Sequence, residues 1–104
     1  MSIEAAALLL ASMLALAPGI AQAADAELGA YLSAECVTCH QLSGHATGGI
    51  PPIVGLPEDH FVQALIAYKT GERPSEVMHS IAARLSTDEI AALAAFFAAQ
   101  KPKN

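Results

Sequence analysis

The feature that most constrains this chain is a pair of cysteines two residues apart, followed directly by a histidine. The motif reads Cys36-Val37-Thr38-Cys39-His40, and both cysteines of the 104-residue sequence lie in it. Two thiols at this spacing can each bond to one vinyl group of a haem, and the histidine that follows can ligate the iron. The motif therefore predicts one covalently attached haem, of the haem c type, bound through Cys36 and Cys39 with His40 as an axial ligand.

Two other uses of the cysteines would need a different context. A redox-active C-x-x-C pair is typical of a thioredoxin-like βαβ unit, whereas this sequence contains no strand pattern. A structural zinc site takes four ligands, for which Cys36, Cys39, His40 and His45 are available, but the usual second ligand pair is missing. Haem attachment is therefore the favoured interpretation.

The N-terminal segment has the pattern of an export signal. An apolar run from Ala5 to Ala17 is followed by a break at Pro18-Gly19 and by Ala21-Gln22-Ala23, an A-x-A cleavage site. The run is shorter than the roughly 20 apolar residues that a membrane-spanning helix needs. We expect cleavage after Ala23 and a periplasmic location.

In this interpretation, residues 1–23 are a signal peptide, and residues 24–104 form one monohaem domain with no membrane span. One feature favours the alternative of an uncleaved anchor: the segment before the apolar run contains Glu4 and no Lys or Arg.

The composition limits both the core and the partners. Five aromatic residues and no tryptophan give a domain of this size little apolar surface to bury, so a haem would supply core volume. The chain has ten acidic and five basic side chains and a net charge of −5, with no basic cluster. Nucleic acid is therefore not an expected partner.

The periodicity of apolar residues predicts an all-α fold. Leu28, Tyr31, Leu32 and Cys36 are expected to share one face of the first helix. The last helix has the clearest start, because Ser86 to Glu89 form a capping box and Leu85 and Ile90 are placed as a hydrophobic staple. The four predicted helices cover about 25–39, from Pro57 to Gly71, about 75–84, and from Ser86 until Lys101-Pro102.

A loop rich in glycine and proline connects the first two predicted helices, from Ser43 to Pro57. The axial histidine needs a hydrogen-bond acceptor for its second ring nitrogen, and a proline carbonyl in the Ile50-Pro51-Pro52-Ile53 turn could supply it. A merely stiff loop explains the prolines equally well.

The second axial ligand has to come from the far side of the porphyrin. Met78 is the only methionine beyond the predicted signal peptide. Its soft thioether suits low-spin iron and raises the reduction potential relative to a second imidazole. Two alternatives are open: Met78 could simply fill a gap in the core, and His79 next to it could be the ligand. His45 and His60 are expected to be solvated.

The order of these features resembles a class I c-type cytochrome over about residues 29–97. The resemblance implies that about four helices and Gly/Pro-rich loops wrap around one haem, and that the first and last helices cross at Gly29 and Leu32 against Leu93 and Phe96 or Phe97. Pro51 to Gly55 is similar to the class's P-x-L-x-G turn, which makes Pro51 the carbonyl acceptor for His40 and Ile53 a haem contact. We also expect the haem faces to pack on Ile53, Leu65, Ile81 and Leu93. Gly29 lies one residue closer to Cys36 than in mitochondrial-type members.

A narrower similarity is to the cytochrome subunit of flavocytochrome c sulfide dehydrogenase. It depends on Gly29 to Leu32, Tyr68 to Arg73, Val77 to Ala82 and Leu85-Ser86. This resemblance implies a non-catalytic electron carrier whose partner is an FAD-containing, sulfide-oxidising flavoprotein. Many such subunits have two haem domains, whereas this chain has one motif.

Because this chain has a single haem motif, a free diffusible carrier between other redox proteins is the alternative function. A haem-based gas sensor is a further class, and it would need an open sixth position on the iron.

Overall fold

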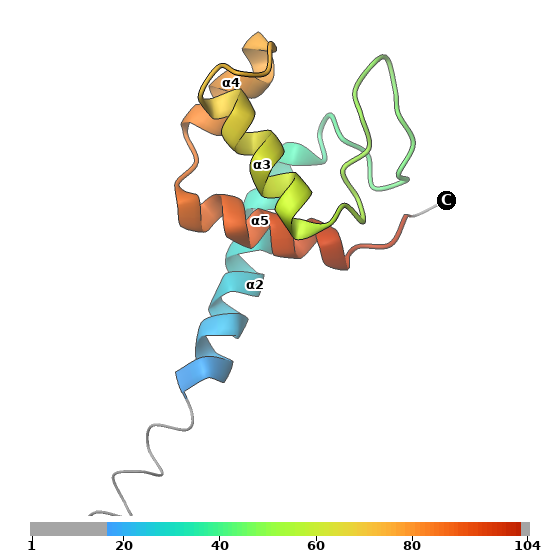
Figure 1. The fold of residues 1–104 in the computed structure, drawn as a ribbon. Coiled ribbons are helices and arrows are strands. Elements are labelled where there is room, and N and C mark those ends of the chain that lie inside the picture. The colour runs from blue at the N-terminus through green and yellow to red at the C-terminus, as the bar shows by residue number, and fades with distance from the viewer. Residues whose placement is uncertain (1–16, 103–104) are drawn as a thin grey trace, which may run out of the picture.

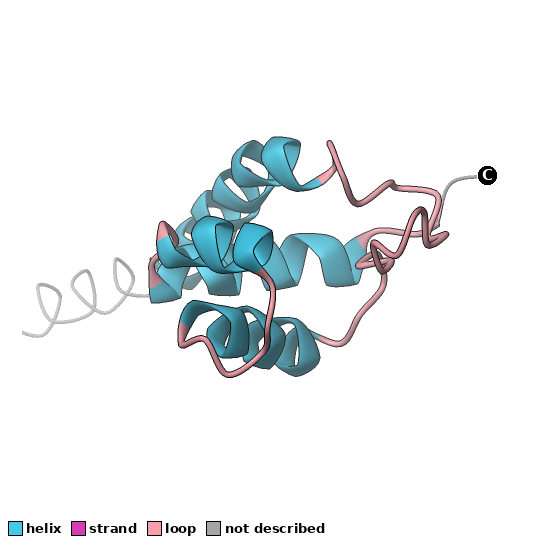
Figure 2. Cartoon of the chain, turned by 90° about the horizontal axis from the view of Figure 1, so that it is seen from above, coloured by secondary structure: helices cyan, strands magenta, loops and turns pink. Residues whose placement is uncertain are grey.

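The computed structural model describes residues 17–102, and these residues form four helices and no strand (Figures 1 and 2). The all-α prediction is therefore confirmed. Residues 1–16, which contain most of the predicted signal peptide, lie outside the described part of the chain. The helices are α2 (Ala17–Cys36), α3 (Glu58–Lys69), α4 (Glu76–Ala83) and α5 (Thr87–Ala99).

Helices α2 and α5 cross each other at a glycine (Figure 1). Gly29 is buried, and a Cβ atom at this position would collide with the carbonyl oxygen of Ala92 and lie 3.0 Å from the Cβ of Phe96. Only a residue without a side chain lets the two backbones approach this closely. The crossing at Gly29 is where the sequence predicted it.

The core lies between α5 and α3. The rings of Phe61 and Phe97 stack with their centroids 5.6 Å apart, and Phe96 meets Phe97 edge to face at 5.1 Å. Aromatic pairs with these separations add to the stability that their buried area supplies. The buried cluster comprises Phe61, Leu65, Ala82, Ile90, Leu93, Ala94 and Phe97.

The start of α5 has the predicted capping box. The Ser86 hydroxyl accepts a hydrogen bond from the Glu89 N–H (3.1 Å), and the Glu89 carboxylate accepts one from the Ser86 N–H (2.8 Å). Leu85 packs against the cluster that contains Ile90, as the predicted staple requires. The helix ends at Ala99, two residues before the predicted stop.

Helices α3 and α4 also lie close to their predicted ranges. Pro57 is the N-cap of α3, and Thr70 is its C-cap. Ser75 caps α4 by accepting a hydrogen bond from the Met78 N–H, and Arg84 is the C-cap. The end residues of both predictions are therefore cap residues or their neighbours.

Helix α2 differs from the predicted range of about 25–39 at both ends. It begins at Ala17 and so includes Pro18 and Gly19; proline is tolerated in a first turn, where its missing N–H has no helical partner. It ends at Cys36, so Cys39 follows the helix instead of closing it.

The predicted apolar face of this helix differs from the observed one in two residues, Leu28 and Tyr31. Tyr31 is 80% exposed. The face turned inward consists of Gly29, Leu32, Ser33 and Cys36, at the i, i+3, i+4, i+7 spacing of a helix stripe. Tyr31 lies two residues from Gly29, about 200° around the helix, and therefore points away from the core.

Candidate functional site

The end of α2 and the turn after it hold both cysteines and the following histidine close together. The N–H of Val37 donates to the Ser33 carbonyl (3.1 Å), and the N–H groups of Cys39 and His40 both donate to the Cys36 carbonyl (3.2 and 2.9 Å). These hydrogen bonds hold the motif in a tight turn, which fixes the positions of the two cysteines and the histidine relative to one another.

The His40 ring is held by the proline turn. Its Nδ1 lies 2.6 Å from the carbonyl oxygen of Pro51, eleven residues along the chain. The nitrogen donates and the carbonyl accepts, which leaves Nε2 as the nitrogen available for a ligand. The sequence had left open whether this turn is only a stiff loop, and the structure contains the contact. A hydrogen bond of this kind orients an imidazole and makes it a better donor to a metal.

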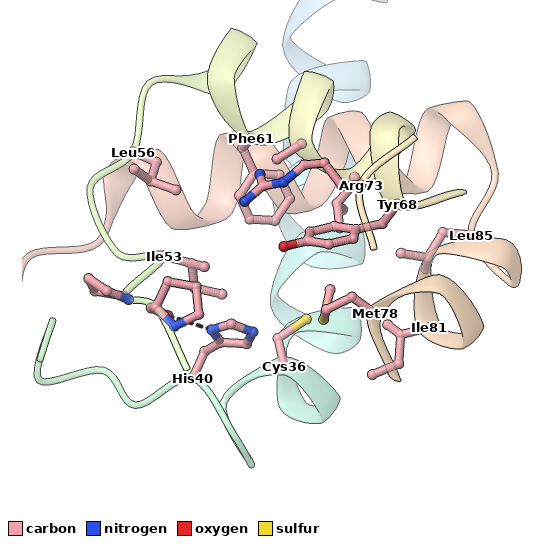
Figure 3. Close-up of a pocket in the computed structure, with 14 residues that line it drawn as sticks. Cys36, His40, Ile53, Leu56, Phe61, Tyr68, Arg73, Met78, Ile81 and Leu85 are labelled. Carbon is pink, nitrogen blue, oxygen red and sulfur yellow. Dashed lines mark hydrogen bonds between the residues drawn. The ribbon is translucent and has the colours of Figure 1, made fainter. Parts of the chain in front are cut away.

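Met78 approaches the same space from α4. It lies in the first turn of α4, where the Ser75 hydroxyl accepts a hydrogen bond from its N–H (3.2 Å), and its side chain is half-buried. Figure 3 shows the sulfurs of Cys36 and Met78 and the ring of His40 turned toward one another. Three of the predicted site residues therefore converge.

The space between these residues is a cavity with mostly apolar walls. It has a volume of about 270 Å³, and a second hollow of about 520 Å³ shares several of its residues. The residues that line both hollows are Cys36, His40, Pro51, Tyr68, Met78 and Ile81. Residues that line only the first are Pro52, Ile53, Leu56, Phe61, Ala64, Leu65, Arg73 and Leu85 (Figure 3).

The two cysteines differ in their surroundings. Cys36 is half-buried at the end of α2, and Cys39 is exposed and lines only the second hollow. Burial raises the pKa of the Cys36 thiol above its ordinary value, and the negative charge of Glu35 raises it further. The thiolate is the more nucleophilic form, so this raised pKa lowers the reactivity of Cys36 toward external reagents.

The other histidines lie away from the cavity. The Nδ1 of His79 lies 2.8 Å from the Tyr68 carbonyl oxygen, and the residue is exposed. His45 and His60 are also exposed. None of the three lines either hollow, so the geometry favours Met78 over its neighbour.

One predicted cavity contact was wrong. Leu93 is 1% exposed, but it lies in the helix core with Phe97 and lines neither hollow. The face of α5 that carries it is turned into the cluster. Ile53, Leu65 and Ile81 do line the cavity.

Sequence reasoning also missed seven residues as walls of the cavity: Pro52, Leu56, Phe61, Ala64, Tyr68, Arg73 and Leu85. The stripe of Phe61, Leu65 and Tyr68 along α3 was the signal that could have located this wall.

These residues fit a haem. An apolar cavity offers a large flat ring the contacts it needs, an imidazole and a thioether are suitable donors to iron, and the cysteine beside them can bond to a vinyl group. A zinc site fits less well. Within residues 17–102, no three His, Cys, Asp or Glu side chains gather closely enough to hold a metal ion.

Comparison with known proteins also supports haem as the bound group. The chain is 36% identical over 76 residues to the cytochrome subunit of sulfide dehydrogenase from Chlorobaculum tepidum, a match that covers 73% of this chain and 69% of that protein. This chain belongs to the class I c-type cytochromes. Members of this family contain haem and transfer electrons, and the four described helices agree with its fold.

Two further relatives are longer. The chain is 33% identical over 72 residues to the thiosulfate dehydrogenase electron acceptor of Thiomonas intermedia, covering 67% of this cytochrome and 33% of that protein. It is 33% identical over 85 residues to cytochrome c4 of Pseudomonas aeruginosa, covering 80% and 42%. The chain therefore spans less than half the length of either relative. No protein-family model matches it.

Among the residues that the structure describes, no helix has the length and apolar character needed to cross a membrane.

Proposed function

We propose that residues 24–104 form a monohaem electron-transfer domain. The haem is bound covalently through the sulfurs of Cys36 and Cys39, and its iron is held between His40 and Met78. The observation that carries the proposal is that Cys36, His40 and Met78 line one apolar cavity. The Pro51 carbonyl fixes the imidazole there.

Each of these residues has a definite task in this mechanism. The bound haem supplies one-electron chemistry at its iron. His40 keeps one orientation because its Nδ1 is occupied by Pro51. Met78 offers a soft thioether, which raises the reduction potential. Holding the iron from both sides by His40 and Met78 would limit rearrangement when an electron arrives or leaves.

An alkaline pyridine spectrum of the exported protein, together with its intact mass, tests haem attachment. We expect the spectrum of a haem whose vinyl groups are saturated and a mass increased by one haem after denaturation. A protein that retains no haem after extraction with acid and acetone would contradict the proposal.

Export to the periplasm with cleavage after Ala23 is part of the same proposal. The pattern of residues 1–23 supports it. Mass spectrometry of the purified holoprotein should find Ala24 as the first residue. A protein that begins at Met1 and stays with the membrane fraction would instead support an uncleaved anchor.

The proposed electron donor is an FAD-containing, sulfide-oxidising flavoprotein. The similarity to the cytochrome subunit of sulfide dehydrogenase supports it, and that match covers 69% of the relative. Sulfide should reduce the haem rapidly only when the flavoprotein is present, and the two proteins should co-purify. Equal reduction rates with and without the flavoprotein would contradict this donor.

A free diffusible carrier is the second candidate. It is supported by the similarity to proteins named an electron acceptor of thiosulfate dehydrogenase and cytochrome c4. Purification of the holoprotein without any flavoprotein, combined with electron exchange with several redox proteins, would favour it over a fixed subunit. A gas sensor is separable from both, because carbon monoxide should leave the ferrous spectrum of a six-coordinate carrier unchanged.

A further inference from the structure

One ion pair joins the helix that ends at the first cysteine to the helix that carries Met78, and the proposed function does not use it. The Arg84 guanidinium donates to the Glu35 carboxylate, with 2.5 Å between Nη2 and Oε1. Glu35 directly precedes Cys36 on α2, and Arg84 is the C-cap of α4. Across the described residues, 17–102, this contact is the one ion pair and the one hydrogen bond between α2 and the capped α4.

Helix α4 has little buried surface of its own to hold it in place. Of its eight residues, all of which the structure describes, Ala82 alone is buried. Val77 is 65% exposed. The helix packs on α3, where the His79 ring is bonded to the Tyr68 carbonyl (2.8 Å), whereas α2 packs on α5. Apolar burial therefore does little to fix the position of α4 relative to α2.

The second hollow lies where these two helices come together. Its lining residues include three from the end of α2 and the turn after it, and three from α4: Glu35, Cys36, Cys39, Val77, Met78 and Ile81. Figure 3 shows Cys36 and Met78 bordering the cavity in this region. The ion pair thus connects two helices that both contribute walls to the hollow.

The arginine is oriented by its own helix. Its Nε donates to the Ser80 carbonyl one turn earlier (3.4 Å). Both charged side chains are exposed, Arg84 by 64% and Glu35 by 57%. An exposed ion pair typically changes an equilibrium constant by about fivefold at most. The pair therefore contributes little to global stability, but an effect of this size is measurable for a local event such as the release of one ligand from iron.

We propose that the Glu35–Arg84 ion pair holds α4 against the end of α2 and so keeps Met78 at the sixth position of the iron. This inference rests on the proposed function, because it requires Met78 to be the ligand. The bond from Cys36 to haem keeps the end of α2 attached, so release of Met78 requires α4 to move away from α2. The ion pair opposes this movement. Glu35 and Arg84 are positioning residues, since neither supplies an atom to the iron.

The test is the affinity of the ferric holoprotein for free imidazole at fixed pH, because imidazole binds the iron only after Met78 has left it. Loss of the near-red Met78–iron band during the titration gives the apparent Kd. Arg84→Gln and Glu35→Gln should each bind imidazole about two- to fivefold more tightly than the wild type, the range of an exposed ion pair.

The directions of these changes identify the cause. The two variants alter the net charge in opposite directions, so a direct electrostatic effect on the iron would shift their affinities in opposite directions. Loss of the ion pair shifts both in the same direction, and the double variant should then resemble either single variant. Wild-type affinity in both single variants, opposite shifts, or additive effects in the double variant would each overturn the inference.

Two controls accompany these variants. Glu27→Gln removes the same charge from an exposed residue two turns earlier on α2 that lines neither hollow. Ser86→Ala removes the cap of α5 and lowers global stability without touching α4. Both should bind imidazole as the wild type does. An equal gain in affinity in Ser86→Ala would show that general destabilisation is the cause, and the inference would fail.

A second measurement needs no variant. Salt screens an exposed ion pair, so raising NaCl from about 0.02 M to about 0.5 M should move the imidazole affinity of the wild type toward that of Arg84→Gln. A wild-type affinity that is independent of salt would overturn the inference. The starting spectrum separates the two proposals. A holoprotein without the near-red band contradicts the proposed ligation, whereas the band with equal affinities in all variants contradicts only the role of the ion pair.

Discussion

The crossing of α2 and α5 and the cavity beside it use apolar side chains in opposite ways. At the crossing, Gly29 lets the two backbones touch, and Phe97 is fully buried against its neighbours. Around the cavity, Ile53 and Met78 are only partly covered, and Val77 on α4 is 65% exposed. The first region is complete as protein alone. The second has apolar walls around a space that a haem would fill.

This difference separates what folds the chain from what gives it a function. Helix crossings that match in shape stabilise a fold through close packing. Walls that face an open cavity gain little until something occupies it, so ligand binding stabilises them by mass action. We therefore expect changes at the crossing to act on stability alone, and changes at the cavity to act on the haem first.

The largest expected effect is loss of covalent attachment. Replacing both cysteines, Cys36→Ala with Cys39→Ala, should leave no haem bound after extraction with acid and acetone, and should sharply lower the yield of folded protein. The reason is that the cavity side loses the group that fills it. Haem staining of a denaturing gel and helical circular dichroism measure the two parts of this prediction.

Each single cysteine variant should lie between the double variant and the wild type. If the double variant instead accumulated to wild-type levels as stable helical protein without haem, the contrast between the two regions would be wrong, because the cavity side would then be stable while empty.

At the crossing, Gly29→Ala should destabilise the holoprotein by about 2 kcal/mol, since overpacking of a close contact typically costs 1–3 kcal/mol. The higher helix propensity of alanine offsets about 1 kcal/mol of the clash at most. Denaturant unfolding followed by circular dichroism measures the change, and the haem spectrum should keep its wild-type form.

Ala30→Ser is the control for this change, because Ala30 is exposed on the same helix. It should alter the free energy of unfolding by less than about 0.5 kcal/mol. A Gly29→Ala protein as stable as the control would mean that the crossing is looser than the contacts with Ala92 and Phe96 indicate.

The smallest expected effect comes from the N-cap serines, because the crossing contains the capped helix α5 and the cavity the capped helix α4. Ser86 caps α5 and Ser75 caps α4. Either serine-to-alanine change should cost about 1 kcal/mol of stability. Only Ser75→Ala should also weaken the Met78–iron band in the near-red absorption spectrum, because Ser75 anchors the N–H of Met78.

The two variants serve as controls for each other. A Ser86→Ala protein with the weakened band, or a Ser75→Ala protein without it, would show that α4 does not position Met78 through its cap.

The sequence predicted best those features that depend on nearby residues. The Ser86 capping box and the ranges of α3 and α4 follow from local patterns of caps, glycine and proline, and the structure has them. The crossing at Gly29 was suggested by family resemblance, because a glycine in a helix does not by itself name its partner.

Features set by the tertiary arrangement were harder to predict. Tyr31 fits an apolar stripe as a residue type, but its direction depends on which face Gly29 turns toward α5. Leu93 is apolar and central in α5, yet only the packing decides that it faces Phe97 and not the cavity. Arg73 reaches the cavity through a turn at Gly71 whose direction the residue pattern did not fix.

The central claim is that His40 and Met78 hold the iron from opposite sides of the cavity, and the near-red charge-transfer band between a thioether and ferric iron tests it most directly. The wild-type holoprotein should show this band, Met78→Leu should lose it, and His79→Gln should keep it, because His79 is bound to the Tyr68 carbonyl outside the cavity. Persistence of the band in Met78→Leu, or its absence from the wild type, would contradict the account.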